Sequence, residues 1–347
     1  MLETLFRRRG RKGTHQIGAG ATRPAPGSHP TTGVAKVSDP VVGEVNGAIQ
    51  LDALMFGEAE RLSPYLIPGS EPVLIDPGPA SSAVGVIATL EALGVDDLAA
   101  ILLTHIHLDH AGAAGILAER YPGCRVMIHE RVAGLLVDPQ PLIKSVESVW
   151  GEQTESLFGL PLAIDGGRIQ PLSDGDRLKF SEAALEAIWT PGHTRAHMAF
   201  LDHESGNLFC GDAIGLQLPE DPAIRPSTPP ADFSTTSTLE SIDRLVDIDS
   251  QRVLLPHFGP ANHEPAELLE AAREALLAWR EAFLRIRGMA SDELELVRLM
   301  NAAVEGGLEK AGPATRRGFE AVNPVWLNIA GLSGEAEREE TRLENGA

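Results

Sequence analysis

Four potential metal ligands stand within six residues, directly after a segment expected to be a buried strand. The segment 99–103 is short and continuously apolar, as in a strand covered on both faces. The ligands that follow it are His105, His107, Asp109 and His110. Alternate residues of an extended chain point the same way, so the first two histidines can bind one ion while the turn after them reaches a second. Three imidazoles so close together would pack poorly in a core, so we expect this strand end to face a polar site.

Strand and helix patterns alternate around this motif. Strands are predicted at 48–56, 65–67, 72–75, 99–103, 126–128, 185–189, 198–201, 207–210 and 252–255, and helices at 84–93, 111–120, 142–158, 239–246 and 266–286. Because there are many strands, several of them in meanders, we expect an α/β protein with two sheets whose outer faces are covered by helices.

Composition divides the chain into four parts. Residues 1–40 are rich in Gly, Pro, Ser and Thr without apolar periodicity, which predicts a flexible extension. A main domain is predicted over 41–264. A helical segment over 265–333 is expected to pack on it, and 334–347 reads as a charged tail.

The charge of the chain is unevenly distributed. The formal net charge is -20, yet residues 1–40 hold seven Lys and Arg against two acidic residues, so the remainder carries about -25. Such a negative field repels polyphosphate backbones, which argues against a nucleic-acid partner.

Two further features bear on location. An apolar run of the ~18 to 20 residues that a membrane span needs is not found in the sequence, which argues against a membrane protein. The two cysteines, Cys124 and Cys210, exclude a disulfide scaffold and fit a reducing compartment. We therefore expect a cytoplasmic protein.

Three more candidate ligands follow predicted strands: His193, Asp212 and His257. Strand ends gather at one edge of a sheet, and sites built there present polar groups on a rigid scaffold. The sequence thus predicts seven ligands converging on one site.

In chain order, these motifs resemble the metallo-β-lactamase superfamily. The resemblance rests on the turn at Asp76, the His-x-His-x-Asp-His run at 105–110, Gly-His at 192–193, Gly-Asp at 211–212 and His257, and it spans about residues 45–265. It implies a four-layered αββα sandwich.

The resemblance also implies a role for each ligand. His105, His107 and His193 would bind one divalent metal ion, while Asp109, His110 and His257 would bind a second, with Asp212 bridging the two. Zinc is the expected metal, with Fe or Mn as alternatives. A hydroxide shared by the ions would be the nucleophile, and Asp109 would be the catalytic residue that orients it and accepts its proton. Asp76 and Thr104 would hold the ligating rings, or else only shape turns.

Differences between this sequence and other branches of the superfamily limit the branches to which it can belong. His107 stands where oxygen-reducing diiron members typically have Glu, which favours a hydrolase. The glyoxalase-II-like branch shares all seven ligands, so the expected substrate is a small-molecule thioester or ester. A phosphodiesterase, or a diiron redox or oxygen-binding protein, remains the alternative. The segment 225–233 either forms a pocket wall or is a surface connection, and the sequence also allows a homodimer.

Overall fold

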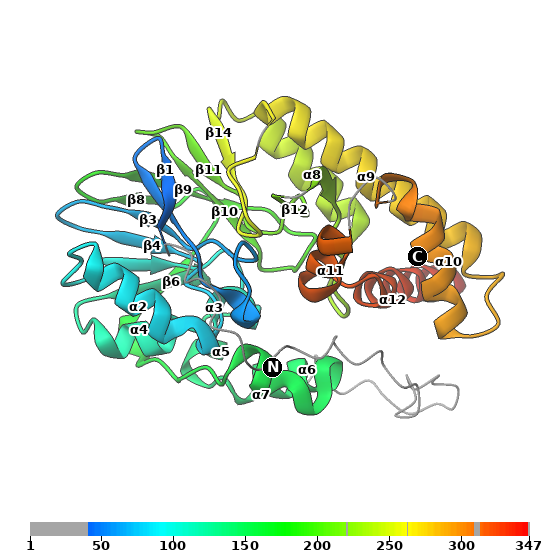
Figure 1. The fold of residues 1–347 in the computed structure, drawn as a ribbon, viewed down its shortest axis with the longest axis horizontal. Coiled ribbons are helices and arrows are strands. Elements are labelled where there is room, and N and C mark those ends of the chain that lie inside the picture. The colour runs from blue at the N-terminus through cyan, green and yellow to red at the C-terminus, as the bar shows by residue number, and fades with distance from the viewer. Residues whose placement is uncertain (1–40, 220, 262, 309–312, 346–347) are drawn as a thin grey trace. The chain divides into compact units, whose positions relative to one another are not determined.

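Two β-sheets pack face to face at the centre of the molecule (Figure 1). The structure is a computed structural model that describes residues 41–219, 221–261, 263–308 and 313–345. The predicted extension over 1–40 lies outside these residues.

The first sheet has seven strands, which follow one another across it in chain order. They are β1 (Val41–Val45), β2 (Ala48–Leu51), β3 (Tyr65–Ile67), β4 (Val73–Ile75), β5 (Ala100–Leu102), β6 (Arg125–His129) and β7 (Ile169–Leu172). The strands β1 to β4 form an antiparallel meander, whereas β4 to β7 run parallel. The parallel half therefore presents the carboxyl ends of several strands at one edge.

The second sheet has five strands in the order β14-β11-β10-β9-β8. Their bounds are β8 (Arg177–Lys179), β9 (Ala184–Trp189), β10 (Met198–Asp202), β11 (Asn207–Phe209) and β14 (Arg252–Leu254). The strands β8 to β11 are an antiparallel meander, and β14 pairs parallel to β11. A separate two-stranded ribbon joins β12 (Leu216–Leu218) to β13 (Asp221–Arg225).

Alternation along the strands produces three apolar layers. In β5, Ala100 and Leu102 face the other sheet, where they join Phe200 and Phe209, while Ile101 faces the helices outside. The outer face of the first sheet is covered by α2 (Ala83–Ala92), α3 (Leu108–Ala111), α4 (Ala114–Arg120) and α5 (Gly134–Val137). The second sheet is covered by α8 (Thr235–Val246) and α9 (Pro265–Ile286). The predicted αββα sandwich is confirmed.

The predicted strand over 48–56 is shorter in the structure. β2 ends at Leu51, and the carboxylate of Asp52 then accepts hydrogen bonds from the backbone amides of Leu54 and Glu60, both at 2.9 Å. This holds a tight loop in which the short helix η1 (Met55–Gly57) forms. Residues after 51 are thereby turned out of the sheet.

The predicted helix over 142–158 is divided at Gly151, whose φ of 62° lies in the left-handed region. The result is α6 (Gln140–Trp150), a short η3 (Gly151–Gln153) and α7 (Thr154–Phe158). Two other single turns, η2 (Ala80–Ser82) and η4 (Gly166–Arg168), lie in loops.

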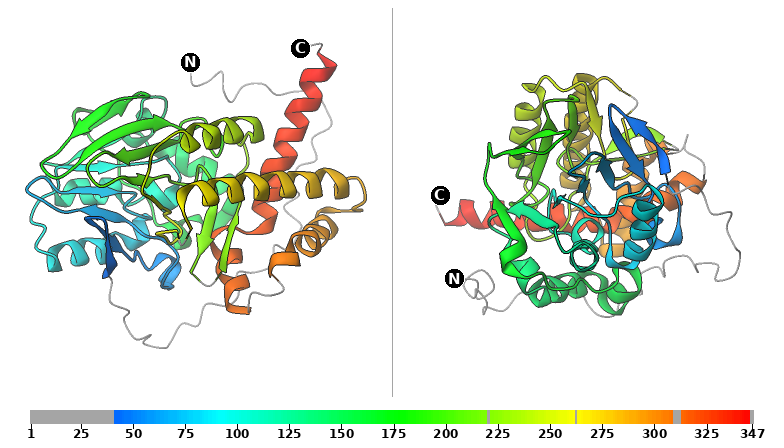
Figure 2. Two further views of the ribbon diagram at one scale, coloured as in Figure 1. Left: turned by 90° about the horizontal axis from the view of Figure 1, so that it is seen from above. Right: turned by 90° about the vertical axis from the view of Figure 1, so that its left-hand side faces the viewer.

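The C-terminal helices form a bundle beside the sandwich (Figure 2). It contains α9, α10 (Glu293–Leu308) and α12 (Val325–Glu344), around a core that includes Trp279, Phe283, Met300, Ile329 and Leu332. The remaining helix, α11 (Pro313–Val322), packs through Phe319 on Leu216 and Leu218 of β12. Within the described residues, no helix is long and apolar enough to cross a membrane.

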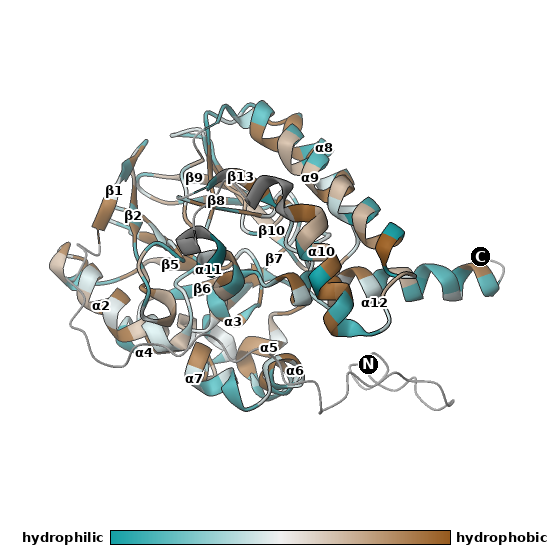
Figure 3. Ribbon diagram, turned by 45° about the vertical axis from the view of Figure 1, so that its right-hand side comes forward, coloured by the Kyte–Doolittle hydropathy of each residue, from teal (hydrophilic) through white to brown (hydrophobic). Residues whose placement is uncertain are grey.

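The predicted charged tail over 334–347 differs from the structure, because α12 continues to Glu344. Its final turns are strongly hydrophilic (Figure 3), and residues 340–345 are exposed. Nearer the middle of α12, the hydroxyl of Thr235 donates to Glu335 at 2.6 Å, and Arg280 donates to Glu339 at 2.9 Å. The first charges of the predicted tail therefore pair with neighbouring elements, while the last residues are helical and exposed.

Candidate metal centre

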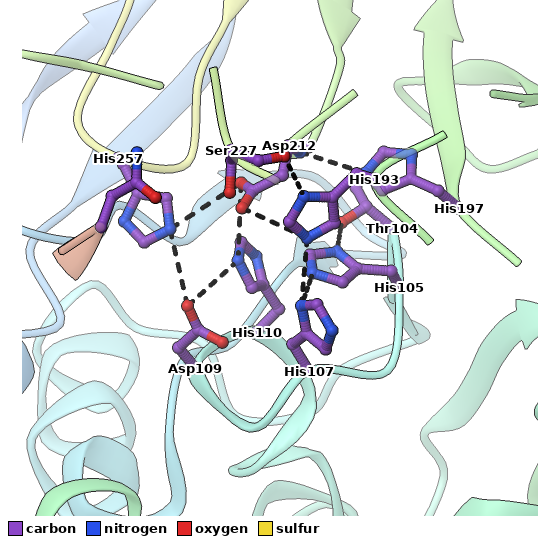
Figure 4. A network of polar contacts seen from close by, with 12 residues as sticks. Thr104, His105, His107, Asp109, His110, His193, His197, Asp212, Ser227 and His257 are labelled. Carbon is purple, nitrogen blue, oxygen red and sulfur yellow. Dashed lines mark hydrogen bonds and ion pairs between the residues drawn. The ribbon is translucent and has the colours of Figure 1, made fainter. Parts of the chain in front are cut away.

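All seven predicted ligands converge at the edge formed by the carboxyl ends of parallel strands (Figure 4). From the first sheet, the loop after β5 carries His105 and His107 and leads into α3, which bears Asp109 and His110. From the second sheet, the turns after β9, β11 and β14 carry His193, Asp212 and His257. The site is therefore assembled from both sheets.

Two of these ligands are each preceded by a glycine, because neighbouring atoms leave no space for a larger residue. A Cβ atom on Gly211 would lie 2.6 Å from Nε2 of His197 and 2.7 Å from Thr104, and one on Gly192 would lie 2.6 Å from the backbone of Thr238. Both residues also have positive φ values, 52° and 145°. The Gly-Asp and Gly-His pairs thus reflect close packing behind the site.

One group of donors consists of three imidazoles. Nδ1 of His107 lies 3.0 Å from Nε2 of His105 and 3.0 Å from Nε2 of His193. The donor atoms around a tetrahedral zinc ion with bonds of ~2.0 Å are spaced by about 3.3 Å, which is close to this arrangement. Three histidine nitrogens so near one another fit a shared cation.

A second group lies beside the first. Oδ2 of Asp109 is 3.5 Å from Nε2 of His110 and 3.6 Å from Nε2 of His257. Asp212 stands between the groups, with Oδ2 at 3.6 Å from Nε2 of His193 and Oδ1 at 3.6 Å from Nε2 of His110. One carboxylate therefore faces both sets of imidazoles, as a bridging ligand would.

Two atoms of this centre are buried without a hydrogen-bond partner in the described part of the chain. They are Nε2 of His110 and Oδ1 of Asp212. A buried polar atom left unpaired costs about 1–3 kcal/mol, so native proteins rarely leave two together. Both atoms point into the space that a metal ion would fill, so the residues fit a dinuclear metal site.

The ligands from the first sheet are held from behind by Asp76 and Thr104. Asp76 accepts hydrogen bonds from the amide and the hydroxyl of Thr104, at 2.8 and 2.7 Å, and from Nδ1 of His110 at 3.1 Å. The Thr104 hydroxyl in turn accepts from Nδ1 of His105 at 3.0 Å. Each bond leaves the Nε2 lone pair of the ring facing the site. Both residues thus contact ligating rings, and Asp76 also makes a turn, with φ of 46°.

The ligands from the second sheet are oriented by backbone carbonyls. Nδ1 of His193 donates to the carbonyl of Ser227 at 3.1 Å, and Nδ1 of His257 donates to that of Arg61 at 2.9 Å. Sequence reasoning missed these partners, since every residue has a carbonyl group and neither position carries a distinctive side chain.

Tyr65 also supports this side of the site. Its hydroxyl contacts the carbonyl of Leu255 at 2.8 Å and that of Gly259, the two residues that flank the turn bearing His257. Burial raises the pKa of Tyr65 well above its ordinary value, so the hydroxyl keeps its proton. The turn is thereby fixed to β3.

Burial sets the protonation of the imidazole group. It holds the pKa of His105 and of His193 well below the ordinary value, and neighbouring histidines add to the effect. Both rings are therefore neutral, the form that binds metal. Burial opposes ionisation of Asp109, but His110 and His257 outweigh it and bring the pKa of this carboxyl well below its usual range. Asp109 is an anion at neutral pH.

Two other histidines, His197 and His263, follow ligand residues in the sequence but lie outside the ligand set. His197 is fully buried behind the site and contacts Asp212, whereas His263 is partly exposed and belongs to no group of converging donors among the described residues.

A pocket opens onto this centre. Among its lining residues are the ligands His107, Asp109, His193, Asp212 and His257. Ser227, Pro229 and Pro230 also line it, so the Pro-rich segment 225–233 does form a wall. The candidate ligands and this pocket therefore form one site.

A known protein family shares the sequence pattern of this site. The profile of the metallo-beta-lactamase superfamily matches residues 63–257, which contain all seven ligands. The chain belongs to the metallo-β-lactamase superfamily. This confirms the resemblance drawn from the motifs.

Individual relatives place the chain within the superfamily. It is 38% identical over 148 residues to the uncharacterized protein YobT of Bacillus subtilis, covering 43% of this chain and 59% of that protein. It is 34% identical over 142 residues to a hydroxyacylglutathione hydrolase of Aeromonas hydrophila, covering 41% of this chain and 42% of that protein. The chain thus spans less than two thirds of these curated relatives. The second name, a synonym of glyoxalase II, supports the glyoxalase-II-like branch.

A solved structure extends the similarity over most of the fold. The metallo-beta-lactamase family protein TTHA1429 from Thermus thermophilus matches with a TM-score of 0.62 and 25% identity, covering 86% of this chain and 95% of that one. The similarity therefore includes elements beyond the range of the superfamily profile.

Proposed function

We propose that this protein is a hydrolase that binds two divalent metal ions and cleaves a small thioester or ester. The observation that supports the proposal most strongly is the placement of Asp212, whose two carboxylate oxygens face separate groups of ligands at 3.6 Å each. A shared anion between two ligand sets is what a pair of adjacent cations requires.

The ligand assignment follows the two groups. His105, His107 and His193 bind one ion; Asp109, His110 and His257 bind the other. Nitrogen and carboxylate donors of this kind suit zinc, with iron or manganese as alternatives. Three protein ligands at each ion, with Asp212 shared between them, would leave room for water or substrate beside the metals.

The metals and the protein side chains would contribute differently to the reaction. When bound, two adjacent cations would lower the pKa of a water towards ~7 and polarise the substrate carbonyl. Asp109 is ionised and faces the pocket, so it can orient the attacking water and accept its proton. The water oxygen forms a bond to the carbonyl carbon, the bond to the alkoxide or thiolate breaks, and Asp109 returns the proton to that leaving group.

Two considerations support carbonyl chemistry over phosphodiester chemistry. Several relatives are named hydroxyacylglutathione hydrolase, a thioesterase name. The chain also carries a formal net charge of -20, which repels anionic polymers at long range. Two cations in the pocket would nonetheless attract a small phosphate, so phosphodiester hydrolysis is the runner-up.

A single preparation can test both reactions. We would measure kcat/KM of the zinc-loaded protein for an S-acyl glutathione, an aryl ester and bis-p-nitrophenyl phosphate, with Asp109→Asn as the background. The proposal expects the carbonyl substrates to be cleaved most efficiently and Asp109→Asn to remove that activity. Fastest turnover of the phosphodiester, abolished by the same substitution, would replace the proposal by its runner-up.

Metal analysis of the same preparation separates the hydrolase from a redox protein. Iron bound at the site without hydrolysis of any of these substrates would favour a diiron redox or oxygen-binding protein.

A further inference from the structure

Much of the pocket lining outside the metal ligands is apolar. On α6, Leu142, Val146 and Val149 recur at helical spacing and line the pocket. Met55 and Phe56 from η1, and Val322 and Leu327 from α11 and α12, complete an apolar wall. Most of these side chains are only partly buried by the protein itself. Apolar surface left open beside polar ligands is what a ligand with an apolar part would cover.

Four aromatic rings reinforce this wall in a continuous row. The ring centres of Phe56 and Phe158 are 5.6 Å apart, those of Phe158 and Trp150 are 5.7 Å apart, and those of Trp150 and Trp326 are 5.2 Å apart. Each pair is edge-to-face, an arrangement that aromatic rings favour. The row links η1, α7, α6 and α12, which are distant in sequence, so the wall is a fixed surface.

Phe56 is held there at a conformational cost. Its φ of 60° lies in the left-handed region, which costs a bulky side chain free energy. The loop that contains it is fastened by the two hydrogen bonds to Asp52. Strain that is kept by specific contacts beside a pocket is typical of a functional surface.

The charged groups of the pocket are confined to the metal ligands. Among the described residues that line it, the ionisable ones are His107, Asp109, His193, Asp212 and His257. None of these described lining residues is Lys or Arg, which would pair with the carboxylates of glutathione or with a phosphate. The wall is therefore suited to a neutral group.

We infer that the substrate carries an uncharged, apolar acyl group that lies along the wall of α6, η1 and α12 while its carbonyl reaches the metal ligands. This inference rests on the proposed hydrolase function and narrows its substrate class. It also predicts that a thioester of glutathione with a small polar acyl group is a poor substrate.

The length of the acyl chain can be varied to test this inference. We would measure kcat/KM of the zinc-loaded full chain for p-nitrophenyl acetate, butyrate and octanoate, and for S-lactoylglutathione. Burying one methylene in an apolar pocket is worth about fourfold, and octanoate has four more methylenes than butyrate, so even partial burial should raise kcat/KM for octanoate by at least about tenfold. S-Lactoylglutathione should be cleaved less efficiently than octanoate.

A charge placed in the wall should remove the preference. Val149 lines the pocket without belonging to the apolar core of the sandwich. Val149→Asp should lower the octanoate-to-acetate ratio by at least about tenfold, and Val149→Leu should preserve the ratio. Val84→Asp is the matched control, since Val84 is 79% exposed on α2 and should leave the ratio and the activity unchanged.

The outcomes distinguish this inference from the proposed function. If every ester is cleaved, but acetate or S-lactoylglutathione is preferred to octanoate, the inference is wrong and the hydrolase proposal stands. If neither esters nor thioesters are cleaved by protein that holds its metal, the proposed function itself fails. Metal content and Tm of each variant show whether it is folded, and a folded Val149→Asp with an unchanged ratio also overturns the inference.

Discussion

The backbone amide of Asp212 donates a hydrogen bond to Nε2 of His197, 3.0 Å away. This nitrogen must therefore be unprotonated, so the ring proton lies on Nδ1, which is 2.8 Å from the hydroxyl of Thr190. Burial lowers the pKa of His197 well below its ordinary value and keeps the ring neutral. A histidine outside the proposed ligand set thus fixes the backbone of Asp212.

Replacing His197 should weaken metal binding without unfolding the chain. In His197→Ala the Asp212 amide loses its acceptor, and changes behind a metal ligand typically cost about 10- to 100-fold in affinity. Competition with a chromophoric chelator would measure this loss. His203→Ala is the matched control, since His203 lies on the surface, 41% exposed. Equal affinities of the two variants would contradict a positioning role for His197.

Asp212→Ala should be far more damaging than His263→Ala. The first change removes an anion that faces both ligand groups, whereas His263 belongs to neither of the groups formed by described residues. We expect about two ions per chain in the wild type and in His263→Ala, and at most one in Asp212→Ala, by elemental analysis. Comparable metal loss in both variants would show that the bridge is wrongly assigned.

The apparent affinity for metal should fall as the pH is lowered, starting above the ordinary pKa of histidine. Burial disfavours the charged form of His110, but Asp109 and Asp212 outweigh it and raise its pKa well above the ordinary value. Below that raised pKa a proton competes with the metal for His110. In metal-free protein the free energy of unfolding changes with pH in the opposite direction. The protonated His110 ring stabilises the fold at low pH, and this contribution is lost as the pH rises through the raised pKa.

Competition with a chelator of known affinity at stepped pH would measure the affinity for metal. Chemical denaturation of metal-free protein at the same pH values would measure the opposite trend in stability. An apparent affinity that stays constant until the pH falls below the ordinary pKa of histidine would refute this account.

Asn328→Ala should lower both stability and activity. The buried side chain of Asn328 accepts from the amide of Thr228 at 2.8 Å and donates to Asn323 at 2.7 Å. Thr228 follows Ser227, whose carbonyl holds His193. Leaving the amide unpaired should cost about 1–3 kcal/mol in the free energy of unfolding. Denaturant titration would measure this, with the exposed Asn345→Ala as a control that should change little.

The side chains that would bind metal could be predicted from the sequence, but most of the contacts that orient these side chains could not. His105 to His110 form a compact motif, and His193, Asp212 and His257 each follow an apolar strand, so their convergence could be predicted. The carbonyl of Ser227 has no sequence signature, and its place depends on the next residue, Thr228, which is hydrogen-bonded to Asn328 one hundred residues later. Contacts over that distance depend on tertiary packing, which local patterns do not record.

Some helices and strands were also predicted wrongly or missed, for related reasons. The strand β7 was missed because it is short and contains Pro171, a residue that sheets tolerate at an edge, where β7 lies. The second half of α12 was predicted as a charged tail because its charges suggest exposure. Arg280, which pairs with Glu339, lies on a different helix.

Each ligand group draws on both sheets: His105 and His107 meet His193, while Asp109 and His110 meet His257. Neither half of the sandwich contains a complete group, so bound metal would link the two halves in addition to their apolar contacts and the hydrogen bonds of Tyr65 and His257. By mass action, an ion that binds only the assembled halves raises the free energy needed to separate them. A fragment carrying one sheet alone could not retain the metals, and two such fragments, mixed with metal, would have a chemical reason to reassemble.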